Sequence, residues 1–185
     1  MPLGVYAAGM PEAVFILDAS GSMTEPASAQ TKIAAAKAVL AQVVPAVAPE
    51  VKIGLAVYGH RRENDCTDIE ILVPPGSEDR AAVLARINAI QPKGMTPISA
   101  AITQVAELLK GRDAETTIVL VSDGEETCAG DPCAVVKALK TAGVKFVMHV
   151  VGFAVTDKAK AQLECIAQAG GGKYFGAADG TALLA

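Results

Sequence analysis

The first apolar run of the chain sets the class of fold. Residues 13–17, Ala-Val-Phe-Ile-Leu, contain no polar side chain, so both faces of a strand formed by them have to be covered. Such strands are typical of parallel sheets that carry helices on both faces. The run ends at Asp18, and Ser20, Gly21 and Ser22 follow before a helical pattern begins. The sequence therefore predicts an α/β protein with short oxygen-bearing side chains at the carboxyl end of its first strand.

The remaining elements alternate along the chain. Strands are predicted at 51–58, 69–73, 117–121, 146–151 and 174–175, and helices at 31–44, from Ser77 to 90, from Thr96 onward, from Asp131 to Gly143 and at 157–169. The polar link 59–67 has no helical period, so strand 69–73, ended by Pro74 and Pro75, is expected to run antiparallel at a sheet edge. Helix-length crossovers join the other strands, which predicts a doubly wound, mostly parallel sheet in one domain spanning residues 1–185.

Two later segments carry further oxygen-bearing side chains at element ends. Thr96 precedes Pro97, where its hydroxyl either caps a helix or turns toward a binding site. Asp123 precedes Gly124 at the end of strand 117–121 and is either a turn residue or a ligand. Asp18 with its neighbouring hydroxyls forms a hard-oxygen set that suits a divalent cation such as Mg²⁺.

Other charged side chains near these segments are expected to face water. Glu125 and Glu126 are predicted to be solvated charges. Lys32 and Lys37 lie off the apolar stripe of helix 31–44. The alternative for Glu125 and Glu126 is that they add negative potential beside Asp123.

Three motifs together resemble the metal-ion-dependent adhesion site of the von Willebrand factor type A (vWA) domain. They are Asp18-x-Ser20-x-Ser22, the Thr96 of Gly-Met-Thr-Pro and the Asp123 of Val-Ser-Asp-Gly, in the family's order over most of the chain. The resemblance implies six strands in the order 3-2-1-4-5-6, with an antiparallel third strand at the edge and helices on both faces. Strands 1 and 4 are then neighbours, which brings Asp18 beside Asp123.

The resemblance also implies a function. Ser20, Ser22 and Thr96 would bind Mg²⁺ or Mn²⁺ directly, and Asp18 and Asp123 would bind it directly or through water; Ca²⁺ is less favoured because it takes more oxygen ligands. A coordination position left open would accept a carboxylate from a protein partner. One departure is Met95, where the family more often has a small residue, and it is expected to crowd the site.

Composition narrows the alternatives. A net charge of −4 and the absence of tryptophan argue against nucleic-acid binding, and no apolar run reaches the roughly 18 to 20 residues that membrane insertion requires. A monomer is expected. The open alternatives are a structural vWA module without a metal-dependent ligand and a Mg²⁺-dependent phosphatase-like enzyme. The latter needs a carboxylate where this chain has Ser20, so no enzyme is predicted.

The four cysteines, Cys66, Cys128, Cys133 and Cys165, allow two disulfides, reduced thiols or a metal cluster. Further resemblance to bacterial A domains that are often exported, through Tyr58-Gly59-His60-Arg61-Arg62 and Asp131-Pro132-Cys133, implies pairing of Cys66 with Cys128 and of Cys133 with Cys165. It also implies a periplasmic or extracellular location, with the cytoplasm as the alternative. Residues 1–9 lack the basic start of a secretory signal, and residues 182–185 suggest the first turn of another helix.

Overall fold

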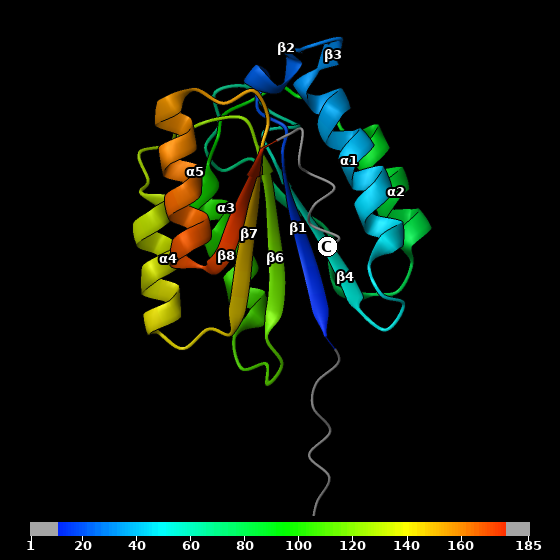
Figure 1. Ribbon diagram of the computed structural model, residues 1–185, viewed down its shortest axis with the longest axis vertical. Helices are drawn as coiled ribbons and strands as arrows, with labels where there is room; N and C mark the ends of the chain where they lie inside the picture. The colour runs from blue at the N-terminus through cyan, green and yellow to red at the C-terminus, as the bar shows by residue number, and fades with distance from the viewer. Residues whose placement is uncertain (1–10, 177–185) are drawn as a thin grey trace, which may run out of the picture.

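A six-stranded sheet forms the centre of the computed structural model, which describes residues 11–176; the predictions for 1–9 and 182–185 lie outside this range. The strand order is β5-β4-β1-β6-β7-β8, and all paired neighbours are parallel except β4 and β5 (Figure 1). The predicted order and the antiparallel edge are confirmed. The strands are β1 (Glu12–Asp18), β4 (Lys52–Tyr58), β5 (Ile69–Ser77), β6 (Thr116–Ser122), β7 (Phe146–Gly152) and β8 (Gly171–Gly176).

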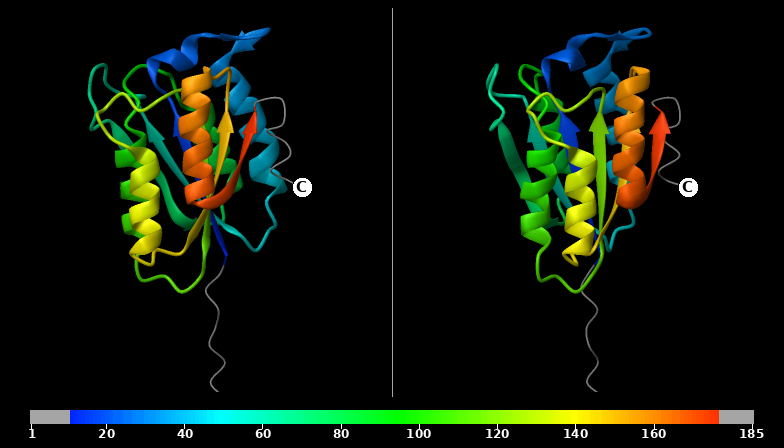
Figure 2. Two further views of the ribbon diagram at one scale, coloured as in Figure 1. Left: turned by 60° about the vertical axis from the view of Figure 1, so that its left-hand side comes forward. Right: turned by 90° about the vertical axis from the view of Figure 1, so that its left-hand side faces the viewer.

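Helices cover both faces of this sheet, as predicted. One face carries α1 (Lys32–Ala46) and α2 (Arg80–Ala89), and the other carries α3 (Ile98–Leu109), α4 (Pro132–Thr141) and α5 (Asp157–Ala169) (Figures 1 and 2). Alternate residues of β1 enter the two cores: Val14 and Ile16 pack on the α3 side, and Phe15 and Leu17 on the α1 side. The fully apolar first strand is therefore covered on both faces, which is why it contains no polar position.

Several element boundaries differ from those predicted. The edge strand β5 continues through Pro74 and Pro75 to Ser77, because a proline without an amide hydrogen is tolerated where no further strand pairs. Helix α2 is capped by Asp79, not by Ser77. Strand β8 already begins at Gly171, within the run of glycines that was expected only to end α5.

A small unit that the sequence did not indicate lies between β1 and α1. It consists of a 3₁₀ helix, η1 (Gly21–Thr24), and a hairpin of β2 (Pro26–Ala27) and β3 (Gln30–Thr31). The unit sits over the carboxyl edge of the parallel strands (Figure 1). It therefore lies beside the predicted site.

Both predicted disulfides are present. Cys66 is bonded to Cys128 and Cys133 to Cys165, with Cα atoms 5.6 and 5.7 Å apart. The first joins the 59–68 loop to the loop between β6 and α4, and the second joins α4 to α5. Among the helices of residues 11–176, none combines the length and hydropathy that a bilayer crossing requires.

Candidate metal centre

Asp18 forms the floor of the candidate site. It is the last residue of β1 and is fully buried, because β4 and β6 pair with β1 on either side. Its Oδ1 accepts a hydrogen bond from the backbone amide of Ser20 at 2.8 Å, and its Oδ2 accepts one from the hydroxyl of Ser122 at 2.6 Å. The carboxylate is therefore fixed by the two strand ends that meet at the point where the chain reverses direction across the sheet.

The two serines of the first motif and Asp123 lie in contact. The Ser20 and Ser22 hydroxyls are 3.1 Å apart, and the Ser22 hydroxyl donates to Asp123 Oδ1 at 2.9 Å. Ser20 and Asp123 are buried, and Ser22 is half-buried. Residues that are 101 positions apart in sequence thus present their oxygens to one place.

Thr96 reaches the same place on the loop that precedes α3. This loop is joined to the first motif by a bridge between Ser20 and Gly94, with the amide of Gly21 donating to the carbonyl of Gly94 at 2.9 Å. Gly94 is required at this crossing, since a Cβ there would lie 2.2 Å from the carbonyl oxygen of Arg62. The loop thereby brings Thr96 to the wall of the cavity that Ser22 and Asp123 also line.

Thr96 does not cap the helix that follows it. The N-cap of α3 is Pro97, which makes no side-chain cap bond, and the helix begins at Ile98. Instead, Glu126 Oε2 accepts from the amide of Ser99 at 2.6 Å. Glu126, and not the Thr96 hydroxyl, therefore accepts a hydrogen bond from an amide in the first turn of α3.

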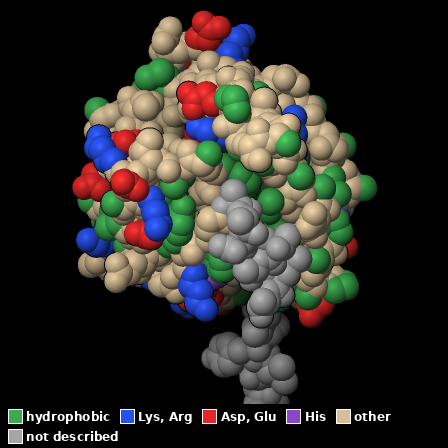
Figure 3. All heavy atoms as spheres, turned by 45° about the horizontal axis from the view of Figure 1, so that its top comes forward, with side chains coloured by type: hydrophobic (Ala, Val, Ile, Leu, Met, Phe, Trp, Pro, Cys, Tyr) green, Lys and Arg blue, Asp and Glu red, His purple; other side chains and the backbone are tan. Residues whose placement is uncertain are grey.

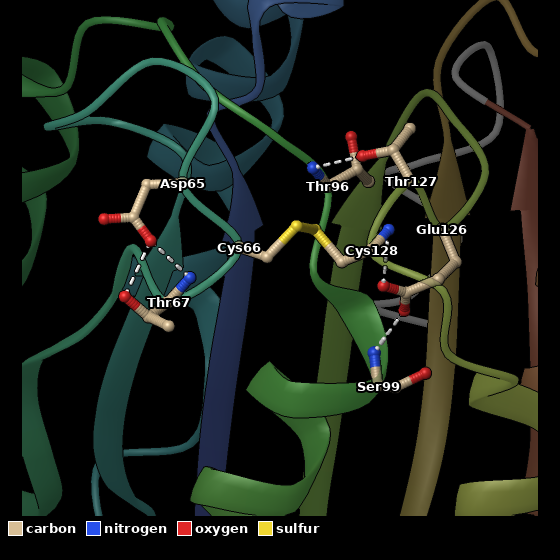
Figure 4. Close-up of a disulfide and its surroundings, with 8 residues drawn as sticks. All are labelled: Asp65, Cys66, Thr67, Thr96, Ser99, Glu126, Thr127 and Cys128. Atoms are coloured by element: carbon tan, nitrogen blue, oxygen red, sulfur yellow. Dashed lines mark hydrogen bonds between the residues drawn. A yellow bond between two sulfur atoms is a disulfide. The ribbon is translucent and has the colours of Figure 1, made fainter.

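Glu126 belongs to a segment that fixes this loop, so the prediction that it is a solvated charge is wrong. Its Oε1 also accepts from the amide of Cys128 at 3.2 Å. Thr127 Oγ1 accepts from the Thr96 amide at 2.8 Å, and the Thr127 amide donates to the Thr96 carbonyl at 3.1 Å. Figure 4 shows that these contacts lie directly beside the Cys66–Cys128 disulfide.

Lys32 is the largest departure from the sequence-based prediction. The helical pattern predicts that this first residue of α1 lies off the apolar stripe, yet its side chain is only 8% exposed. Its Nζ lies 2.8 Å from Asp123 Oδ2 and 2.6 Å from Glu25 Oε2. A helical period predicts which side of a helix packs against the sheet. It does not predict that the unit of η1 and the hairpin covers the first turn of α1.

Burial and charge act together on the ionisable groups of the site. Burial raises the pKa of Asp18, and the nearby Asp123 carboxylate raises it further, against hydrogen bonds from Ser122 and Ser20. Burial alone would lower the pKa of Lys32, but Asp123 and Glu25 outweigh it and raise the pKa. Tyr58, buried beneath the site with its hydroxyl 3.4 Å from Ser122 Oγ, has a pKa raised well above its ordinary value by burial and by Asp18.

The donor set fits a small hard cation that is held largely by hydroxyl groups. Within residues 11–176, no three side chains of the His, Cys, Asp and Glu types gather into a metal cluster. A cation here would therefore rely on Ser20, Ser22 and Thr96 beside the two aspartates, a set of oxygen ligands suited to Mg²⁺ or Mn²⁺.

A cavity of about 400 Å³ opens from this place to the surface. Thr96 lines this cavity, and Met95 is not among its lining residues in the part of the chain that the structure describes. Acidic and basic side chains lie next to one another on this face of the molecule (Figure 3), and Glu125, which lines the cavity, pairs with Lys158 at 2.6 Å. Among the described lining residues, the acidic ones, Glu25, Asp123, Glu125 and Glu126, outnumber the basic Lys32, and the opening leaves room for a group from outside.

The site also contains residues that the sequence did not predict for it: Ser122, Tyr58, Lys32 and the segment 126–128. Ser122 and Tyr58 end strands next to Asp18, so their contacts depend on sheet pairing, which no local pattern reveals. Position at a strand end next to the first motif was the one available signal for both.

Comparison with known proteins agrees with this architecture. The family model for the von Willebrand factor type A domain matches residues 13–126. Two uncharacterized proteins of Bacillus subtilis (strain 168), YwmD and YwmC, are 28% and 31% identical to this chain; the alignments cover 88% and 86% of it and 76% and 74% of the relatives.

Solved structures share the fold at lower identity. BatB from Bacteroides thetaiotaomicron has a TM-score of 0.74 at 19% identity, covering 94% of this chain and 95% of that one. The pilus adhesin SpaC from Lactobacillus rhamnosus GG has a TM-score of 0.73 at 13% identity, covering 95% of this chain and 30% of that one. With its sheet order and a family match over residues 13–126, this chain belongs to the von Willebrand factor type A domain family.

Proposed function

We propose that this domain is a protein-binding module that depends on a divalent metal ion. Ser20, Ser22 and Thr96 would hold Mg²⁺ or Mn²⁺, with Asp18 and Asp123 contributing directly or through water. The contact chain from Ser20 through Ser22 to Asp123, with steps of 3.1 and 2.9 Å beside an open cavity, carries this proposal.

The choice of ligands determines what such a site would bind. Hydroxyl oxygens carry no charge, so an ion held mainly by them stays more electrophilic than an ion held by several carboxylates. When bound, the ion would supply an open coordination position for an acidic oxygen. We therefore propose a partner protein that presents a carboxylate, with the domain itself acting as a monomer and without enzymatic turnover.

The two disulfides support a location outside the cytoplasm. Disulfides persist in oxidising compartments such as the periplasm and the cell exterior. Both cysteine pairs of this chain are bonded. We propose that the domain meets its partner in the periplasm or at the cell surface.

A structural module without a metal-dependent ligand is the second candidate, and one observation favours it. The ammonium of Lys32 already pairs with Asp123 at 2.8 Å. That pair neutralises one of the two buried carboxylates, so the fold does not need a cation to balance it.

The test combines metal titration with partner capture. Protein freed of metal by EDTA should bind Mg²⁺ in calorimetry, and Asp18→Asn should abolish this binding while the far-UV circular dichroism is kept. Asp113→Asn, an exposed position before β6 at the opposite end of the sheet, is the matched control and should bind as the wild type does.

Capture from periplasmic or surface extract should require Mg²⁺ and fail in EDTA. A structural module would lose only thermal stability in EDTA, and an enzyme would hydrolyse a phosphoester such as p-nitrophenyl phosphate. Unchanged Mg²⁺ affinity in Asp18→Asn would refute the proposed function.

A further inference from the structure

We propose that Lys32 is a permanent cation of this site that weakens metal binding and keeps the metal-loaded site positively charged, which selects an anionic partner group. This inference rests on the proposed function, because it concerns the same residues. Lys32 lies outside the three sequence motifs, and its proposed role is to determine which partner group binds.

The position of Lys32 is fixed by contacts on both sides. Its backbone amide donates to the carbonyl of Glu25 at 2.9 Å, which anchors the start of α1 to the turn after η1. Its ammonium then reaches Asp123, whose side chain is only 1% exposed. The second partner, Glu25, has a side chain that is 60% exposed, so water screens that ion pair and the contact with Asp123 is the stronger one.

Both oxygens of Asp123 are engaged by these contacts. Oδ1 accepts from Ser22 and Oδ2 accepts from Lys32. A dication held by the hydroxyls would have to share this carboxylate with the ammonium. Repulsion between the two cations therefore lowers the affinity for the metal.

The count of buried charges shows what the loaded site would attract. Asp18, Asp123 and Lys32 are buried together and leave one negative charge in excess. A dication reverses this to one positive charge in excess, and a single partner carboxylate then brings the buried charges to zero. Without Lys32, two aspartates and a dication are already neutral, and the same carboxylate would introduce an unbalanced buried charge.

Substitutions at position 32 test the inference. Lys32→Met removes the charge with a side chain of similar length, Lys32→Gln removes the charge but can still donate a hydrogen bond to Asp123, and Lys32→Arg keeps the charge. Lys37→Met is the matched control, because Lys37 lies on the same helix but donates to the carbonyls of Asn88 and Ile90. Circular dichroism and thermal unfolding in EDTA establish that each protein is folded.

Calorimetry with Mg²⁺ gives the first result. Lys32→Met and Lys32→Gln should bind Mg²⁺ roughly tenfold more tightly or better, whereas Lys32→Arg and Lys37→Met should match the wild type. A purely structural role of Lys32 would weaken metal binding on its removal, so the direction of the change is decisive. Equal or weaker binding by both neutral variants overturns the inference.

Acetate, titrated into Mg²⁺-loaded protein and followed by NMR shifts, gives the second result. The neutral variants should bind acetate several-fold more weakly than the wild type; equal acetate binding overturns the proposed selection of anions. A wild type that binds no Mg²⁺ while Lys32→Met does would support the effect of Lys32 and refute the proposed function. Absence of Mg²⁺ binding in every variant would refute both.

Discussion

The two disulfides should stabilise the fold to a similar extent but have different neighbours, which allows a controlled test of how Thr96 is held. Cys66–Cys128 adjoins the segment 126–128, and that segment hydrogen-bonds to Thr96 and to the start of α3. Cys133–Cys165 joins two helices outside the metal centre. We compare the double variant Cys66→Ser/Cys128→Ser with Cys133→Ser/Cys165→Ser.

The expected loss of stability follows from the sequence separations of 62 and 32 residues. In the chain-entropy description, closing a loop of either size lowers the entropy of the unfolded chain, which stabilises the folded protein by about 4 kcal/mol in each case. The two variants should therefore be destabilised to a similar extent. Only the first should also lose metal affinity, by roughly tenfold, the lower range for groups that hold a metal ligand in place.

Urea unfolding followed by circular dichroism measures the stability of the two double variants, and calorimetry with Mg²⁺ on the folded proteins measures affinity. The comparison between the variants removes the general effect of a missing cross-link. Equal Mg²⁺ affinity in both would show that the Cys66–Cys128 bond does not position Thr96.

Two further substitutions test the loops around the site. Asp68→Asn should destabilise the protein by roughly 2–4 kcal/mol at pH 7. Burial raises the pKa of Asp68, but hydrogen bonds from the Arg62 amide and from the Arg61 guanidinium and amide outweigh burial, so the pKa of Asp68 is lowered. A lowered pKa contributes stability above about pH 4 that is lost as the pH falls further, so urea midpoints should converge in acid; a constant difference contradicts this. Gly94→Ala should lower the stability of the fold by roughly 1–3 kcal/mol and weaken Mg²⁺ binding, because its Cβ would meet the Arg62 carbonyl. Gly124→Ala is the control, since a Cβ at Gly124 meets nothing within 4 Å. Equal stability of the two alanine variants would contradict the steric argument.

The general plan of the main sheet could be predicted because its strands and the helices that cover it have local sequence patterns. The fully apolar run 13–17 required cover on both faces, and the two cores supply it. The polar link 59–67 predicted the antiparallel edge, which β5 forms. Strand ends then placed Asp18 and Asp123 at one edge of the sheet, and resemblance to a known family supplied the order that brings them together.

Local rules failed where tertiary contacts outweigh them. Pro74 and Pro75 normally end a strand, but on the outer edge their missing amide hydrogens cost nothing. Gly172 marks a close approach within β8, since a Cβ there would lie 2.0 Å from the Met148 carbonyl oxygen. Proline and glycine therefore occur within strands where no amide hydrogen is needed for pairing or where the neighbouring strand leaves no room for a side chain.

The site shows the same limit for charged residues. A lysine at the start of a helix ordinarily faces water, and Lys32 is buried because an unpredicted hairpin covers it and Asp123 lies within 2.8 Å. Glu126 is held by amides of α3 and of its own loop, contacts that only the fold creates. Sequence indicated which oxygens could bind a cation, but not which charges surround them.

The candidate ligand oxygens could be predicted and the surrounding charges could not. This difference has a physical origin, which also indicates what part of the site can change by substitution. Asp18 is fixed by the sheet: Ser122 and the Ser20 amide hold its carboxylate at a buried strand end, where any displacement would disturb pairing on both sides. Glu25, between η1 and β2, and Lys32, the first residue of α1, instead lie outside the main sheet. Substitutions at positions 25 and 32 can therefore alter the charge around the site while Asp18 stays in place, so under the proposed function metal affinity and partner preference would vary without loss of the fold.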